Sequence, residues 1–281
     1  MNHPLSCGWD IIHACNYRCP YCFFLPSWAA HPDENNRRHL ACSREEWLGF
    51  WERCHEQAGA FQIEVAGGEP CCHPDLIPLL RGVSRRHRLR VVTNLSLDVE
   101  TVIGVLDPAA VSWSVSFHPT QTSLEALLPK LRRLAAAGFA TTASIVAYPE
   151  SFGALEGWRA RIAAAGIPCF LNPFQGTWNG RRYPQSYTPA EADVLGRTAL
   201  SEAADLRMGR RSPRGLPCAA GRRYLRLWPD GSIYRCCAAT ELGLGPVGHI
   251  RDEKIPLSAV DEPCPAQRCF APNEAVLLSG V

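Results

Sequence analysis

Six short apolar runs alternate with segments of helical periodicity over the first two-thirds of the chain. The apolar runs are WDIIHA (9–14), FQIEVAGGEP (61–70), LRVVTNLS (89–96), VSWSVSFHP (111–119), ATTASIVAYP (140–149) and IPCFLNPF (167–174). The segments with helical periodicity are 43–59, 75–87, 98–106, 123–138 and 155–166. A strand followed by a helix, repeated along the chain, is typical of a parallel sheet. Six units are too few for a closed eight-fold barrel, so we expect an α/β fold built on a partial (β/α)6 barrel.

Two local signals refine this expectation. Ser43 and Glu46 have the spacing of a capping box at the start of the first helical segment. Pro129 falls inside the segment 123–138, where a proline is expected to kink the helix or to mark its true start.

The pattern changes near residue 175, where the chain becomes polar and rich in turn residues. A helix is expected at 188–206, followed by a hairpin at 224–237 whose central Asp-Gly pair is a strong turn signal. We therefore predict two domains, a partial barrel over 1–180 and a small C-terminal domain with a β-hairpin and a helix over 181–281.

Composition limits where this protein works and what it binds. No apolar run reaches the length of about 20 residues that spans a bilayer, and the N-terminus does not resemble a signal peptide, so we expect a cytoplasmic protein. The formal net charge is only +2, which gives no general reason to expect a nucleic-acid or membrane partner. The arginine-rich runs RRHRLR and RMGRRSPRG raise RNA binding as an alternative, but solvated faces or an anion clamp are favoured over it.

The chain has 14 cysteines, and three of them stand in the stretch CNYRCPYC as Cys15, Cys19 and Cys22. In a large chain of a reducing compartment, cysteines are expected to bind metal or do chemistry rather than form disulfides. A structural zinc site commonly uses two pairs of ligands, whereas this loop offers three thiols and no obvious local fourth. Three thiolates suit a 4Fe–4S cluster that keeps one iron open to a small molecule.

Two motifs then resemble the radical S-adenosylmethionine (SAM) superfamily. CNYRCPYC matches its CxxxCxΦC loop, with Tyr21 as the aromatic residue, and AGGEP matches the GGE turn that follows the second strand. The resemblance covers roughly residues 7 to 175. It implies a 4Fe–4S cluster on Cys15, Cys19 and Cys22, with SAM chelated to the open iron. The cofactor-binding residues that it implies are Tyr21, Gly67, Gly68, Glu69 and Pro70, and at later strand ends Thr93, Asn94, Ser116 and His118. The alternative for the last four is that they only cap strand ends.

A second set of cysteines follows in the C-terminal part. Cys218 and Cys236 flank the hairpin, and Cys264 and Cys269 come later. The segment GSIYRC resembles the opening of SPASM and twitch extensions, which implies one auxiliary 4Fe–4S cluster on these four thiolates. CPAQRC has four intervening residues where the class often has two, and Cys237 can replace a ligand, so the fourth ligand stays open. A zinc site on the same four thiolates is the alternative.

The other cysteines have simpler expected roles. Cys42 and Cys54 are interpreted as small buried hydrophobic residues, and Cys71 and Cys72 as neighbours of the active site. Cys169 can point into the barrel, where a thiol could return a hydrogen atom to a substrate radical; burial in the core is the alternative.

The resemblance implies an oxidoreductase or tailoring enzyme that cleaves SAM reductively to a 5′-deoxyadenosyl radical, with an electron from a partner such as flavodoxin or ferredoxin. We expect the radical to abstract hydrogen from an unactivated C–H of a natural-product-type small molecule, giving dehydrogenation, epimerisation or cross-linking. Because few residues precede Cys15, we expect no fused N-terminal peptide-binding module. The alternatives are maturation of a ribosomally made peptide, RNA modification and a non-catalytic metal-binding protein.

Overall fold

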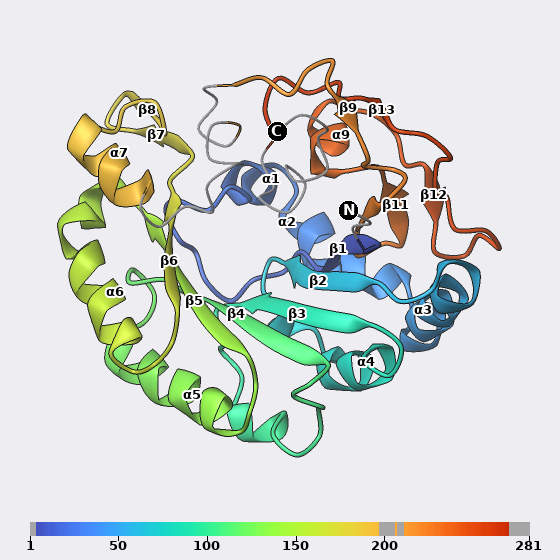
Figure 1. Cartoon of the computed structure of the whole chain (residues 1–281), viewed down its shortest axis with the longest axis horizontal. Helices are drawn as coiled ribbons and strands as arrows, with labels where there is room; N and C mark the ends of the chain where they lie inside the picture. Colours follow the sequence, from blue (N-terminus) through green and yellow to red (C-terminus); the bar gives the residue numbers. More distant parts are fainter. Residues whose placement is uncertain (1–3, 197–205, 207–210, 270–281) are drawn as a thin grey trace.

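A computed structural model describes residues 4–196, 206 and 211–269 of the chain. One sheet dominates it, with the strand order β12-β11-β10-β1-β2-β3-β4-β5-β6 (Figure 1). The first six strands are all parallel to their neighbours, in sequence order. They are β1 (Ser6–Ile12), β2 (Gln62–Gly67), β3 (Arg88–Thr93), β4 (Val111–Phe117), β5 (Thr141–Ala147) and β6 (Cys169–Pro173). The two ends of the sheet, β12 and β6, are not paired with each other, so the predicted open barrel is confirmed.

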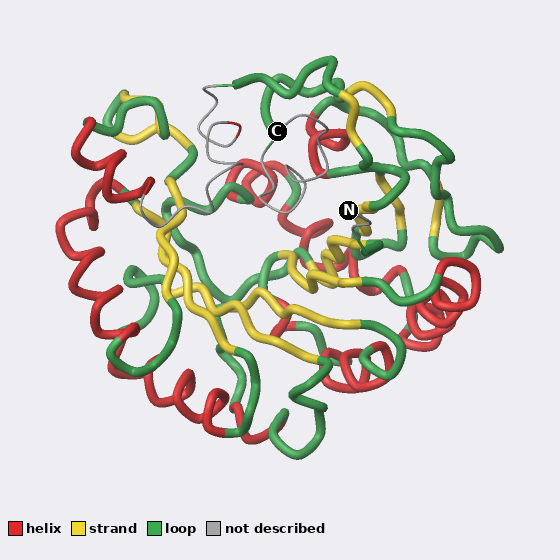
Figure 2. The backbone as a smooth tube through the Cα atoms, in the orientation of Figure 1, coloured by secondary structure: helices red, strands yellow, loops and turns green. Residues whose placement is uncertain are grey.

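Helices cover the outer face of the curved sheet (Figures 1 and 2). They are α3 (Arg44–Ala58), α4 (Leu76–Val83), α5 (Leu124–Ala136) and α6 (Leu155–Ala163). Successive residues of a strand face opposite sides. Val65, Val91 and Trp113 are partners on neighbouring strands, and so are Ala143 and Cys169. These residues therefore lie on the side of the sheet that the helices cover, and this side is apolar and largely buried. The opposite, inner side is more polar, since the serines at 112, 114, 116 and 144 lie on it.

The remaining short elements lie in the connections and in the C-terminal part. They are α1 (Leu25–Ala30), α2 (Pro32–Arg37), η1 (Arg38–Ala41), η2 (Pro70–Cys72), η3 (Val99–Thr101), η4 (Pro149–Ala154), β7 (Gly176–Trp178), β8 (Arg181–Tyr183), α7 (Pro189–Gly196), β9 (Pro217–Cys218), α9 (Cys237–Glu241) and β13 (Glu262–Pro263). The described part of the chain has no helix long and apolar enough to cross a membrane.

Several local predictions can be compared with these elements. Ser43 caps α3 with both bonds of the capping box, as predicted. Pro129 lies inside α5, which begins at Leu124, so the proline does not mark the start of the helix. The helix predicted at 98–106 is only the short 3-10 turn η3. Its β-branched residues and the left-handed Gly104 (φ 78°) explain the difference, because both weaken an α-helix.

The C-terminal hairpin extends the barrel sheet. β10 (Tyr224–Leu227) runs parallel to β1, and β11 (Ser232–Tyr234) folds back on it through the predicted turn. The third strand, β12 (Gly248–His249), completes the edge. The domain boundary near residue 180 stays a prediction. The pairing of β10 with β1 shows that the two predicted domains contribute strands to one sheet. Of the predicted helix 188–206, α7 forms the first part, and 197–205 lie outside the described residues.

A buried ion pair holds β10 against β1. The Arg226 guanidinium donates two hydrogen bonds to the Asp10 carboxylate, at 3.1 and 2.6 Å. Burial raises the pKa of Asp10, but the Arg226 charge, the neighbouring His13 and their hydrogen bonds together outweigh it, so the pKa lies below its ordinary value. The pair is therefore ionised at neutral pH and links residues 216 positions apart.

Candidate functional site

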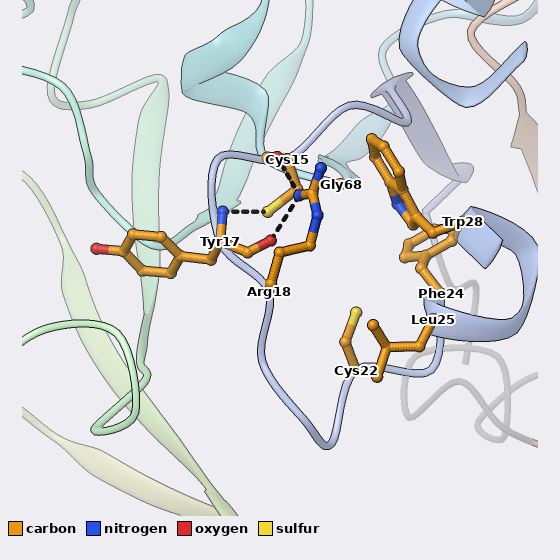
Figure 3. A pocket seen from close by; sticks show the side chains of 8 residues that line it. All are labelled: Cys15, Tyr17, Arg18, Cys22, Phe24, Leu25, Trp28 and Gly68. Carbon is orange, nitrogen blue, oxygen red and sulfur yellow. Dashed lines mark hydrogen bonds between the residues drawn. The ribbon is translucent and has the colours of Figure 1, made fainter. Parts of the chain in front are cut away.

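The predicted cysteine loop follows β1 and forms one wall of a pocket (Figure 3). Cys15 and Cys22 line this pocket, while the thiol of Cys19 is buried beside it and is not part of the lining. A tight turn joins the last two cysteines, since the Cys22 N–H donates to the Cys19 carbonyl at 3.0 Å. The other lining residues are Tyr17, Arg18, Phe24, Leu25, Trp28 and Gly68.

Arg18 brings a positive charge into this pocket. Its guanidinium donates to the carbonyls of Cys15 (2.6 Å) and Tyr17 (2.8 Å) and lies 4.3 Å from the ring centre of Trp28. Figure 3 shows the side chain between the thiols of Cys15 and Cys22. Burial raises the pKa of Cys22, and the Arg18 charge acts against that rise, which favours the thiolate form that metals require.

Burial acts on these thiols in the opposite direction. It raises the pKa of Cys15 and of Cys19 to about 11, and that of Cys22 above its ordinary value. A bound cation must therefore displace the protons, so metal uptake by this loop releases protons.

The donor set of the loop fits an iron–sulfur cluster. All 14 cysteines are thiols rather than disulfides, so the three sulfurs remain chemically competent ligands. Within residues 4–196, 206 and 211–269, no three His, Cys, Asp or Glu side chains are grouped closely enough to hold a single metal ion. A multi-iron cluster spans more widely spaced sulfurs than one zinc ion does, and Cys15 and Cys22 line the same pocket.

The GGE turn packs directly against the cysteine loop. Gly68 donates its N–H to the Ile12 carbonyl, and Glu69 donates to the Ala14 carbonyl, both at 2.8 Å. A side chain at Gly68 would collide with the His13 and Ala14 carbonyls, which explains why the turn needs glycine here. Gly67 has a φ of 129°, a conformation that also favours glycine. Pro70 follows and begins η2.

Glu69 is a buried brace within this site. Its carboxylate accepts hydrogen bonds from the backbone N–H of Asn94 (2.6 Å) and Cys71 (2.9 Å) and from the Thr93 hydroxyl. Burial raises its pKa, and the three donors act against that rise by stabilising the ionised form. The brace joins the end of β2 to the end of β3.

Hydrogen bonds connect the loop after β3 to the cysteine loop and to α5. Asn94 donates its side-chain amide to the Asn16 side chain at 2.9 Å, which ties the loop to the cysteine loop. Leu95 has a φ of 57°, which is rare for a residue with a side chain. The Lys130 ammonium stabilises this conformation by donating to the Leu95 carbonyl at 3.0 Å.

The end of β4 contacts the aromatic residue of the cysteine motif. The Tyr21 hydroxyl and His118 Nδ1 are 3.2 Å apart, and their rings stack with centroids 5.8 Å apart. Burial lowers the pKa of His118 to about 4, so this imidazole is neutral at physiological pH. Ser116 lies on the inner face of the sheet, with its hydroxyl 3.4 Å from that of Ser144 on β5.

Cys169 is placed differently from the prediction that it points into the barrel. Its register partner is the buried Ala143, and it shares the face of β6 with the buried Leu171. Arg159, from the covering helix α6, lies close enough to influence the thiol electrostatically. The Cys169 side chain therefore lies on the helix-covered face, away from the inner surface.

Four residues of this site were not found from the sequence. They are Asn16, Arg18, Trp28 and Lys130. Asn16 and Arg18 lie between the motif cysteines, and that position was the one available signal for them. Trp28 and Lys130 reach the site from helices, where nothing in the sequence distinguishes them from ordinary helix residues.

Comparisons with known proteins agree with this arrangement. No family model matches the chain. A PqqA peptide cyclase of Gluconobacter oxydans is 27% identical over 207 residues, which cover 70% of this chain and 49% of that protein. A GTP 3′,8-cyclase of a Picosynechococcus species is 28% identical over 125 residues, or 43% of this chain and 34% of the relative. The chain thus spans about half or less of the length of these relatives.

Solved structures share the fold at low sequence identity. SuiB of Streptococcus suis matches with a TM-score of 0.64 at 13% identity, over 90% of this chain and 66% of that one. The protein anSMEcpe, solved with bound AdoMet and the Cp18Cys peptide, matches with a TM-score of 0.61 at 16% identity, over 91% and 79% of the two chains. In sequence and in fold the chain therefore resembles radical SAM enzymes. The superfamily predicted from the two motifs is confirmed, and its members use SAM and a 4Fe–4S cluster.

The C-terminal cysteines lie in a second, smaller cluster of buried residues. The four predicted ligands share a small core with several alanines and Tyr224, apart from the main barrel core. They are Cys218, Cys236, Cys264 and Cys269. Cys237 is only half-buried and begins α9. The ligand set of this second site stays a prediction.

Proposed function

We propose that this protein is a radical SAM enzyme that modifies an unactivated C–H position of a peptide. The similarity to a PqqA peptide cyclase over 207 residues carries this proposal, and the peptide bound to the structural neighbour anSMEcpe supports it. The earlier expectation of a small-molecule substrate has less support. It rested partly on the short segment before Cys15, which says nothing about a separate protein that presents the peptide.

The residues of the chain have distinct parts in this reaction. With a 4Fe–4S cluster bound, reductive cleavage of SAM supplies a 5′-deoxyadenosyl radical that removes a hydrogen atom from the substrate. Cys15, Cys19 and Cys22 would hold that cluster. Gly68, at the pocket wall, would offer its backbone to the methionine part of SAM, and Glu69 would keep the turn in place.

The polar inner face supports this assignment further. Asn94, Ser116 and His118 stand at or beside the carboxyl ends of β3 and β4, where ligands of parallel α/β folds bind. The neutral His118 can accept or donate a hydrogen bond without adding a charge beside the radical. The four C-terminal cysteines would hold an auxiliary cluster that takes up an electron from the substrate radical.

Deuterium transfer tests the substrate class. The anaerobically reconstituted enzyme is incubated with SAM, a reductant and a candidate peptide that is deuterated in its side chains. Deuterium in 5′-deoxyadenosine is the expected result, with Cys169→Ala as a control that should behave like the wild type. Transfer from a small nucleotide or sugar, and from no peptide, would contradict the peptide proposal. The match to a GTP 3′,8-cyclase makes that second outcome a specific alternative.

A further inference from the structure

Arg235 occupies a distinctive position in the second cysteine cluster. It directly precedes Cys236, and its side chain is only 14% exposed. Its guanidinium donates to three backbone carbonyls: Ala220 from Nε (2.8 Å), and Cys218 (3.2 Å) and Glu262 (2.9 Å) from Nη2. From Nη1 it also forms an ion pair with the Glu262 carboxylate at 2.7 Å.

These contacts join three separate parts of the chain. Cys218 belongs to β9, and Glu262 belongs to β13 and stands two residues before Cys264. The two strands pair with Glu262 opposite Cys218, and the Cys264 N–H donates to the Leu216 carbonyl at 2.9 Å. One side chain therefore fastens the segments that carry three of the four proposed ligands.

We propose that Arg235 is the positioning residue of the auxiliary iron–sulfur site. This inference rests on the proposed function, because it presumes that a cluster binds there. A site with thin apolar packing needs its ligands held in place before metal arrives, and here the core around the cysteines consists largely of alanines. A guanidinium can do this because its planar fork offers five donors, whereas a lysine offers a point charge.

The charge of Arg235 has a second consequence. The reduction potential of an iron–sulfur cluster depends on nearby charge and hydrogen bonding. Because reduction makes a thiolate-bound cluster more negative, a fixed positive charge stabilises the reduced form. Arg235 should therefore raise the potential of the auxiliary cluster, and a residue that only stabilised the fold would not have this effect.

The test compares Arg235→Gln and Arg235→Lys in the full-length reconstituted protein. Arg222→Gln is the control, because Arg222 forms its ion pair with Asp261 in the same region. Iron and sulfide per chain, the potential of the second cluster and SAM cleavage are measured. The wild type should hold about eight irons, and Arg235→Gln should hold about half as many while still cleaving SAM. Arg235→Lys should keep more iron than the glutamine variant, because it retains the charge, and should show an altered spectrum of the second cluster.

The outcomes separate the two proposals. Full iron and an unchanged potential in Arg235→Gln would overturn the role of Arg235. About four irons in the wild type itself would instead remove the auxiliary cluster from the proposed function. Should Arg235→Gln lose its fold by circular dichroism, Arg235→Lys decides: an unchanged potential and spectrum in that variant overturn the inference, and an altered spectrum supports it.

Discussion

The buried carboxylate of Glu69 connects the GGE turn to the rest of the site. Two backbone N–H groups and one hydroxyl donate to it, and these come from the ends of two different elements. An amide in its place has only one oxygen acceptor, and its NH2 group would face a donor. Glu69 therefore fixes the orientation of Gly68 in the pocket because its ionised carboxylate accepts these three hydrogen bonds, which an amide of the same size could not do.

We expect Glu69→Gln to lower the free energy of unfolding by about 1–3 kcal/mol and to weaken SAM binding. Urea unfolding and SAM titration measure the two effects. Glu64→Gln is the matched control, because Glu64 pairs with Arg90 at 3.4 Å in a partly exposed position. Such a pair contributes less than about 1 kcal/mol. Equal stability of Glu69→Gln and wild type would mean that the carboxyl is neutral and that the brace is misassigned.

Among the helices, α5 lacks one backbone hydrogen bond because it contains a proline. Pro129 is exposed and lies in the sixth position of the helix, where its missing N–H cannot bond to the Glu125 carbonyl. Because Pro129 is exposed, the helix loses a hydrogen bond and buries little of the ring in return.

Pro129→Ala should therefore stabilise the protein by about 1–2 kcal/mol, after the added entropy of the unfolded chain is subtracted. Thermal or urea unfolding measures this change. Arg132→Ala, at another exposed position of α5, serves as control and should have little effect because both residues favour helices. A loss of stability in Pro129→Ala would show that the proline helps the helix to follow the sheet.

At the scale of the whole molecule, the C-terminal hairpin and the barrel form one sheet through β1 and β10. The buried pair of Asp10 and Arg226 lies at this junction. Arg226→Leu should lower the unfolding free energy by about 3–5 kcal/mol, because it leaves the Asp10 carboxylate buried without its partner.

The double variant Asp10→Asn, Arg226→Leu removes the charge as well, so it should recover part of that loss. Denaturant unfolding of the two variants and the wild type measures the difference. Equal destabilisation by the single and double variants would contradict the idea that the unpaired charge is the main cost.

The sequence predicted the barrel well because strand and helix periodicities are local properties. The six parallel strands and the α3 cap follow from them directly. The pairing of β10 with β1 could not be predicted, since no local pattern relates Tyr224 to Ser6 across the chain. The helix predicted at 98–106 was wrong for a local reason, because the β-branched residues around Ile103 already disfavour an α-helix.

The candidate site was predictable only where a motif marked it. The three loop cysteines and the GGE turn lie together as the motifs imply, and their ligand roles remain predictions. The orientation of Cys169 was ambiguous because IPCFLNPF is apolar on both faces, and only its pairing with Ala143 decides it. The peptide substrate proposed above rests on the similarity to a PqqA peptide cyclase, and no residue pattern indicated it.

Reductive SAM cleavage is the most direct test of the central claim, that the loop from Cys15 to Cys22 makes this chain a radical SAM enzyme. The anaerobically reconstituted wild type should form 5′-deoxyadenosine from SAM with a strong reductant. The variant with alanine at Cys15, Cys19 and Cys22 should form none, although it keeps its fold by circular dichroism, because the cluster then lacks all three ligands. Equal 5′-deoxyadenosine formation by the two proteins, or a wild type that binds only zinc and leaves SAM intact, would contradict the claim.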